Sequence, residues 1–301
     1  MAGWFRRPAT GGRSARETGS FETSGNERSI VKVLFCGDVV GQAGREVVCT
    51  RVPELRRQLD LDAVIVNGEN AAHGFGITEE ICQSFFAAGV DVITGGNHSW
   101  DRREIIEFIS QDVRLLRPLN YPEGTPGWGA AVYPTANGRS IMVLQVMGRL
   151  FMDPLDDPFA AADRALRNHR LGQSVHCIIA DVHAEATSEK ASLGVVLDGR
   201  VSLVAGTHTH VPTADARILP GGTAYITDIG MCGDYDSVIG MEKTEAVNRF
   251  VRKIPGGRLA PAGGEATLCA VYLETDDETG LARRVEPVRL GGHLPEFWPF
   301  S

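Results

Sequence analysis

The chain has 301 residues and a net charge of −8, with 43% hydrophobic and 23% charged residues. This balance is typical of a globular protein that can bury a core of its own. It argues against a protein that binds long nucleic acid through phosphate contacts, because no basic stripe follows the N-terminal segment. No apolar stretch reaches the length of a membrane span, which argues against a membrane protein.

The six cysteines are scattered and none forms a C-x-x-C pair, so neither a zinc finger nor a disulfide scaffold is expected. Cys36, Cys177 and Cys269 lie in apolar runs, where a thiol behaves as a small core residue. This usage is typical of a reducing compartment and predicts a cytoplasmic protein. Residues 1–28 contain arginine but no apolar signal segment, so we expect a disordered extension there and one domain over 29–301.

From residue 29 onward, apolar β-prone runs alternate with segments of helical periodicity. The apolar runs predict strands over 30–36, 63–66, 91–94, 130–133, 141–146, 176–180, 201–205, 224–227 and 267–273. The periodic segments predict helices over 45–59, 78–88, 102–110, 158–170 and 243–251. Thr78 is expected to cap the second helix, and Pro53 to kink or divide the first.

The order of these elements predicts the architecture. Early alternation of strands and helices is typical of a parallel sheet with helical crossovers. The later half is richer in strands and in turn signals such as the Pro-Gly-Gly at 220–222, which favours a second or mixed sheet. We therefore expect an α/β protein in which two packed sheets are flanked by helices.

Residues that commonly bind metal ions follow five of the predicted strands. They are Asp38 after the first, Glu69 and Asn70 after the second, Asn97 and His98 after the third, His183 after a later strand, and His208 and His210 after the next. The carboxyl ends of strands in an open α/β sheet line one crevice, where ligands bind. Side chains far apart in sequence would therefore meet at one edge.

Each cluster taken alone has an ordinary structural explanation. Asp38 between glycines suits a turn or a helix cap, Asn97 suits a turn, and a lone histidine is most often a buried core residue. Turn chemistry does not, however, predict histidine or glutamate, and four of the eight histidines lie at predicted strand ends. His208 and His210 alternate along an extended segment, so both imidazoles can face one pocket. The joint pattern predicts a metal site.

The motifs GDVVG, NGENAAHGFGIT, GGNHSWD, DVHAEATSEK and GTHTHVPTAD occur in this order. Together they resemble the calcineurin-like metallophosphoesterases, and within them the bacterial YmdB-type branch, which is linked to 2′,3′-cyclic nucleotide phosphodiesterase activity. The resemblance extends over about 31–290. It departs from the branch at Gln145, where asparagine is expected, and from many members of the superfamily in lacking an Asp-x-His pair after the first strand.

This resemblance implies a four-layer α/β/β/α sandwich and a centre of two divalent ions. By the same resemblance, Asp38, Asn70 and His210 would hold one ion, Asn97, His183 and His208 the other, and Glu69 would bridge them. Nitrogen and oxygen ligands without a thiolate suit Fe or Mn, and also Zn. A hydroxide bridging the ions would attack the phosphorus of a small phosphate ester, and His98 would protonate the leaving group as the general acid.

Several points stay open at this level. Arg149 follows a strand and could contact a substrate phosphate through its planar fork, or be a surface arginine. An amidohydrolase also uses two metals and a His-x-His pair, but that pair lies on its first strand. A broad phosphatase or nuclease shares the chemistry, and a regulatory protein that binds metal and phosphate with little turnover would need the same ligands. Assembly into a homo-oligomer is left open.

Overall fold

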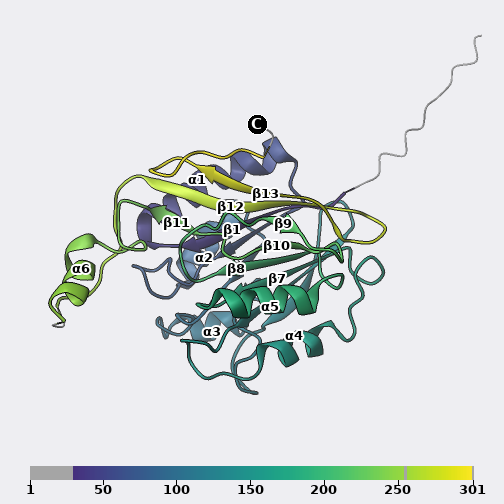
Figure 1. Cartoon of the computed structure of the whole chain (residues 1–301), viewed down its shortest axis with the longest axis horizontal. Coiled ribbons are helices and arrows are strands. Elements are labelled where there is room, and N and C mark those ends of the chain that lie inside the picture. The colour runs from purple at the N-terminus through teal and green to yellow at the C-terminus, as the bar shows by residue number, and fades with distance from the viewer. Residues whose placement is uncertain (1–29, 254–255, 300–301) are drawn as a thin grey trace, which may run out of the picture.

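The computed structural model describes residues 30–253 and 256–299, so the extension expected over 1–28 lies outside the described residues. Two mixed β-sheets pack face to face, and helices cover the outer side of each (Figure 1). The predicted four-layer α/β/β/α sandwich is therefore confirmed. Within the described residues, no helix combines the length and apolar character needed to cross a bilayer.

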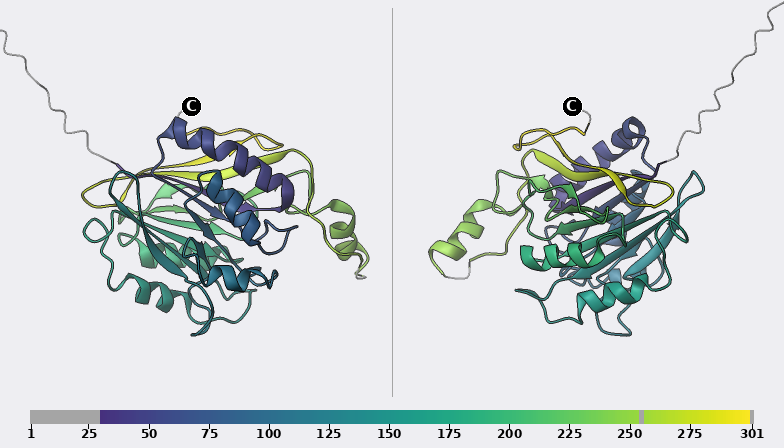
Figure 2. Two further views of the ribbon diagram at one scale, coloured as in Figure 1. Left: turned by 180° about the vertical axis from the view of Figure 1, so that it is seen from behind. Right: turned by 45° about the vertical axis from the view of Figure 1, so that its right-hand side comes forward.

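The first sheet has seven strands in the order β13-β12-β11-β1-β2-β3-β4. Their bounds are β1 Lys32–Val39, β2 Ala63–Asn67, β3 Val92–Thr94, β4 Leu115–Leu116, β11 Met231–Asp234, β12 Ala266–Thr275 and β13 Ala282–Leu290. Strands β11, β1, β2, β3 and β4 run parallel to one another, whereas β12 runs antiparallel to β1 and β11, and β13 pairs antiparallel with β12. Helices α1 (Gly41–Leu59), α2 (Glu79–Ala87) and α3 (Ile105–Ile109) belong to this half of the sandwich (Figure 2).

The second sheet has six strands in the order β5-β6-β7-β8-β10-β9. Their bounds are β5 Ala130–Pro134, β6 Ser140–Met147, β7 Cys177–His183, β8 Leu203–Thr207, β9 Arg217–Ile218 and β10 Ala224–Ile226. The four inner strands are parallel and the two edge strands antiparallel. Helices α4 (Pro158–Leu166) and α5 (Thr187–Leu197) cover the outer face.

Alternation along the strands separates the hydrophobic core into layers. In β1, Leu34 and Cys36 pack with the core under α1 and α2, while Val33 and Phe35 face the second sheet. A third layer lies between the second sheet and its helices. All six cysteines lie within the described residues and are free thiols. The core thus fixes both sheets, and with them the loops at their ends.

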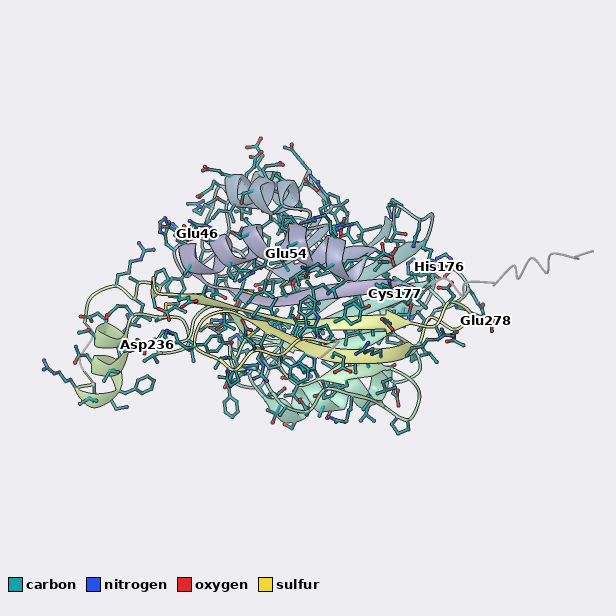
Figure 3. All side chains as sticks on the ribbon, turned by 90° about the horizontal axis from the view of Figure 1, so that it is seen from above. Glu46, Glu54, His176, Cys177, Asp236 and Glu278 are labelled. Carbon is teal, nitrogen blue, oxygen red and sulfur yellow. The ribbon has the colours of Figure 1, made fainter. Side chains whose placement is uncertain are left out.

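The carboxyl ends of the parallel strands face the end of the molecule from which α6 (Lys243–Val251) projects. Figure 3 shows His176 and Cys177, where β7 begins, at one end, and Asp236, just beyond β11, at the other beside α6. Strand β7 therefore runs toward the α6 end and terminates there in His183. The loops that carry the predicted ligands gather on this side.

Most predicted elements are present, with some corrections. The side chain of Thr78 accepts a hydrogen bond from the amide of Ile81, which confirms the predicted cap. Helix α1 is one helix from Gly41 to Leu59, so Pro53 does not divide it, and α3 and α4 are shorter than predicted. Strands β4, β9, β11 and β13 and helix α5 were not expected. Helix α5 buries Glu189 and Lys190 while exposing valines, which hides its periodicity.

Candidate metal centre

Both sheets contribute side chains to one polar cluster at their carboxyl ends. Asp38 lies near the end of β1, where the pairing with β2 shifts register after Cys36 and re-aims the chain. His183 is the last residue of β7. The loops that follow β2, β3 and β8 carry the remaining candidates, which are Glu69, Asn70, Asn97, His98, His208 and His210.

The Nε2 atom of His183 is the centre of this cluster. It lies 3.0 Å from Oε1 of Glu69, 2.9 Å from Oδ1 of Asn97 and 3.2 Å from Nδ1 of His208. His183 and Glu69 are almost fully buried. Three electron-pair donors from three different loops therefore surround one imidazole nitrogen, an arrangement in which a cation can take the place of the shared proton.

The buried side chains of His183 and Glu69 each stabilise the charge of the other. Burial opposes a charge on His183, but the carboxylates of Glu69 and Asp38 raise the pKa of its imidazole to about 9. Burial likewise opposes a charge on Glu69, yet His183 lowers the pKa of its carboxyl to about 2. Positive charge at this point, from a proton or from a metal ion, is therefore stabilised by the surrounding acids.

His208 and His210 lie in a loop with an uncommon backbone. Their φ angles are 97° and 66°, a left-handed region that non-glycine residues seldom adopt. The amide of His208 donates to Asp38, and burial together with His183 lowers the pKa of the His208 imidazole to about 3. Its Nε2 lies 3.3 Å from Glu185. Strain of this kind concentrates at functional sites.

Asp38, Asn70 and His210 are the remaining candidate ligands, of which Asp38 and His210 lie close enough to interact electrostatically. The side-chain Nδ2 of Asn70 donates to the carbonyl of Gly74 at 3.0 Å. The side-chain Oδ1 of Asn70 is buried without a hydrogen-bond partner among the described residues. Nδ1 of His210 lies 2.8 Å from the carbonyl of Ile239, and as the donor of that bond it leaves Nε2 with a free electron pair. Burial raises the pKa of Asp38, whose charged form would be stabilised by a cation.

These donors fit the divalent ions that the resemblance implies. The ligand atoms of Glu69, His183 and His208 lie within 4.8 Å of one another, and the orphaned Oδ1 of Asn70 is an acceptor that a buried position should not leave unpaired. Carboxylate, amide and imidazole donors without a thiolate match Fe, Mn or Zn. A possible metal-binding group is therefore present.

His98 stands beside the cluster. Its backbone amide donates to Glu69 at 2.9 Å, which fixes the loop after β3 against the carboxylate. Its Nδ1 lies 2.9 Å from Oδ2 of Asp101. The rings of His98 and Phe75 pack edge to face, with their centroids 5.0 Å apart. Because Asp101 accepts the hydrogen of Nδ1, the opposite nitrogen of His98 is left for a ligand.

Among the described residues, neither a hydrogen bond nor an ion pair joins the side chain of Arg149 to the cluster. Its backbone amide donates to the carboxylate of Glu189, and its guanidinium lies 3.8 Å from Asp157 at the exposed start of α4. Its contact with a substrate phosphate stays a prediction. Gln145, the departure from the family pattern, is buried and donates to Asp181 at 2.8 Å and to the carbonyl of Gly95 at 2.7 Å.

Several residues that support the cluster were not assigned roles from the sequence. They are Asn67, Asp101, Asp181, Glu189, Lys190, Thr207 and Asp228. Asp228 accepts from Lys190 at 2.7 Å and from both the amide and the hydroxyl of Thr209, between the two histidines. Asp101 lies in a motif that carries the resemblance, which could have drawn attention to it. The others are buried polar residues whose partners only the fold brings close, although all of them except Asp228 also lie in the quoted motifs.

Paired mixed sheets with nitrogen and oxygen donors at their carboxyl ends define the metallophosphoesterase class, as the resemblance predicted. Within this class, the model of the YmdB-like protein family matches residues 34–288, and the chain belongs to that family.

Individual relatives agree with this assignment. The 2′,3′-cyclic-nucleotide 2′-phosphodiesterase of Bacillus subtilis (strain 168) is 48% identical over 258 residues, which are 86% of this chain and 96% of the relative. A crystal structure of a phosphatase from Mycoplasma pneumoniae matches with a TM-score of 0.82 and 33% identity, covering 88% of this chain and 94% of the other. The crystal structure of a Thermus thermophilus protein matches with a TM-score of 0.81 and 43% identity, covering 87% of this chain and 100% of the other.

Proposed function

We propose that this chain is a phosphodiesterase that hydrolyses 2′,3′-cyclic nucleotides at a centre of two divalent ions. The coarser assignment, an enzyme that hydrolyses phosphate esters, is confirmed by relatives named as a phosphodiesterase and a phosphatase. The cyclic nucleotide as substrate is inferred from the Bacillus subtilis relative. The assignment of residues to the two ions is inferred from the family resemblance, and the geometry of this chain supports it for Glu69, His183 and His208.

One observation carries the proposal. Glu69, Asn97 and His208 place electron-pair donors within 3.2 Å of Nε2 of His183, beside a buried amide oxygen of Asn70 that has no partner among the described residues. We infer that Asn97, His183 and His208 hold one ion and Asp38, Asn70 and His210 the other, with Glu69 between them. Such ions supply positive charge to phosphoryl oxygens and lower the pKa of a water molecule.

The side chains of the protein then perform two tasks. Only Asp38 and Glu69 among the proposed ligands are acids, so the occupied centre keeps a net positive charge that attracts an anionic ester. His98 donates a proton to the leaving ribose oxygen, oriented by its Nδ1 contact to Asp101. The oxygen of water, having released one proton to solvent, would bond to phosphorus while the bond from phosphorus to that ribose oxygen breaks. The proton of His98 neutralises the alkoxide, and His98 regains a proton from solvent.

Hydrolysis of 2′,3′-cyclic AMP by metal-quantified protein tests this proposal, with wild type measured beside His98→Ala. We expect the variant to lose about 10²–10⁴-fold in turnover while retaining the metal content of the wild type. Loss of metal in the variant would make His98 a ligand instead of the acid. If loaded wild type hydrolysed neither this ester nor a bis-aryl phosphate, a regulatory protein that binds metal and phosphate would be the better description.

A further inference from the structure

A buried chain of hydrogen bonds runs behind the candidate metal centre, on the side of His183 away from Glu69. The hydroxyl of Thr207 donates to Oδ1 of Asp181 at 2.7 Å, and the same hydroxyl lies 2.8 Å from Nδ1 of His183. All three residues have no exposed surface. They come from the ends of β7 and β8, which are adjacent parallel strands.

The direction of these bonds follows from the number of hydrogens. A hydroxyl has one hydrogen, and that of Thr207 points to Asp181. Its oxygen can therefore only accept from His183, which requires the hydrogen of the imidazole to be on Nδ1. The side-chain amide of Asn67 gives one of its two hydrogens to Gly95 at 2.8 Å, and its nitrogen lies 3.4 Å from Nδ1, so the hydroxyl of Thr207 is the nearer partner of Nδ1. Nε2 is then the atom whose electron pair faces the proposed ion.

We propose that Thr207 and Asp181 are positioning residues that fix the tautomer and ring orientation of His183 for metal binding. This inference rests on the metal centre of the proposed function, and neither residue contacts the ion or the substrate. Partners of this kind hold metal-binding imidazoles in place in many proteins. Here the carboxylate of Asp181 acts through the hydroxyl of Thr207. The direction of the Thr207 hydrogen bond therefore decides which nitrogen of His183 carries the hydrogen.

The two oxygens of Asp181 have different partners, which fixes the direction of the hydrogen bond from Thr207. Oδ2 accepts from Nε2 of Gln145 at 2.8 Å, while Oδ1 accepts from Thr207. In Asp181→Asn the amide oxygen would stay with Gln145, and the amide nitrogen would face Thr207. The hydroxyl would then have to accept from the amide and donate to Nδ1. That tautomer carries its hydrogen on Nε2, where the ion should bind.

The test is a metal titration of Thr207→Val, Thr207→Ser and Asp181→Asn by chelator competition with Zn²⁺ and Mn²⁺. We expect Thr207→Val and Asp181→Asn to lose about 10–100-fold in affinity, as when comparable partners are removed elsewhere. Thr207→Ser keeps the hydroxyl and should bind almost as the wild type does. Equal affinity in Thr207→Val and wild type would overturn the proposal, and a wild type that binds no metal would instead overturn the metal centre itself.

Thr223→Val is the matched control for loss of a buried hydroxyl. Thr223 donates to the carbonyl of Val201 at 2.7 Å and accepts from Gly199 at 2.9 Å, and it lies at the amino end of β10, whereas the ligands follow the carboxyl ends of the parallel strands. We expect it to lose thermal stability and keep metal affinity. If Thr223→Val lost as much metal affinity as Thr207→Val, the loss at Thr207 would be explained by general destabilisation, which would contradict the proposal.

A spectroscopic measurement reports the tautomer directly. In zinc-loaded protein labelled with ¹⁵N-histidine, the hydrogen of His183 should be bound to Nδ1 and show a nuclear Overhauser contact to the methyl group of Thr207. A hydrogen on Nε2, with the metal on Nδ1, would overturn the assignment even if affinity fell in the variants.

Discussion

Oδ1 of Asn97 lies 2.9 Å from Nε2 of His183, although 86 positions separate the two residues in the chain. Asn97 follows β3 of the first sheet, whereas His183 ends β7 of the second. The contact therefore exists only because the two sheets pack face to face with their parallel strands ending on the same side. The candidate site is a property of the sandwich, and either sheet alone would hold half of it.

Gly96 keeps this contact close. A Cβ atom at Gly96 would lie 2.1 Å from Oε2 of Glu69 and 2.5 Å from Nε2 of His183, so one of these side chains would have to move. We expect Gly96→Ala to weaken metal binding by about 10-fold or more while the protein remains folded. Metal titration and circular dichroism check this. Gly263→Ala, which meets nothing within 4 Å, should leave the affinity unchanged, and unchanged affinity in both variants would contradict the packing described.

A substitution of Asp101 tests whether His98 acts as a proton donor or as a metal ligand. Its carboxylate lies 2.9 Å from Nδ1 of His98 and holds the imidazole ring in one orientation. We expect Asp101→Asn to slow hydrolysis of 2′,3′-cyclic AMP, by less than the about 10²–10⁴-fold loss expected for His98→Ala. Turnover of a bis-(p-nitrophenyl) ester should fall little, because its leaving group needs no proton. Equal losses on both substrates would argue against a proton-donor role.

Lys190 supports the loop of His208 and His210 from behind. It is fully buried with its ammonium 2.7 Å from Asp228, which also binds Thr209. Removing one partner of a buried ion pair leaves an uncompensated charge, so Lys190→Met should lower the free energy of unfolding by about 3–5 kcal/mol. Urea unfolding of metal-free protein measures this. Lys243→Met, which breaks the exposed pair with Asp236, should change stability little, and equal effects would be inconsistent with this role for Lys190.

Metal removal should destabilise the protein without unfolding it. The core is built by apolar layers between the sheets and under the helices, which do not need a metal ion to form, so the metal-free form should remain folded. Binding to the folded state adds stability by mass action, about 2.7 kcal/mol for an ion at 100 times its Kd. Thermal unfolding with and without chelator checks this, and Tm should rise with the concentration of added Mn²⁺. A Tm independent of metal would be incompatible with the proposed centre.

The sequence predicted the sandwich and the proposed ligands for a common reason. Buried parallel strands are continuous apolar runs, and the polar residues at their ends stand out against them. Strand β13 escaped this pattern because it is a charged edge strand with Pro287 in its ladder, and α5 because its buried face carries Glu189 and Lys190. Thr207 and Asp181 lie in motifs that carry the resemblance, but their role could not be assigned because the hydrogen bond between them is formed only when β7 and β8 pair.

The most direct test of the two-ion centre is anomalous diffraction from crystals of the Mn²⁺-loaded protein. Two peaks are expected, one among Asn97, His183 and His208 and one among Asp38, Asn70 and His210, with Glu69 contacting both. A single peak elsewhere, or ions that leave His183 and Asn70 without contact, would contradict it.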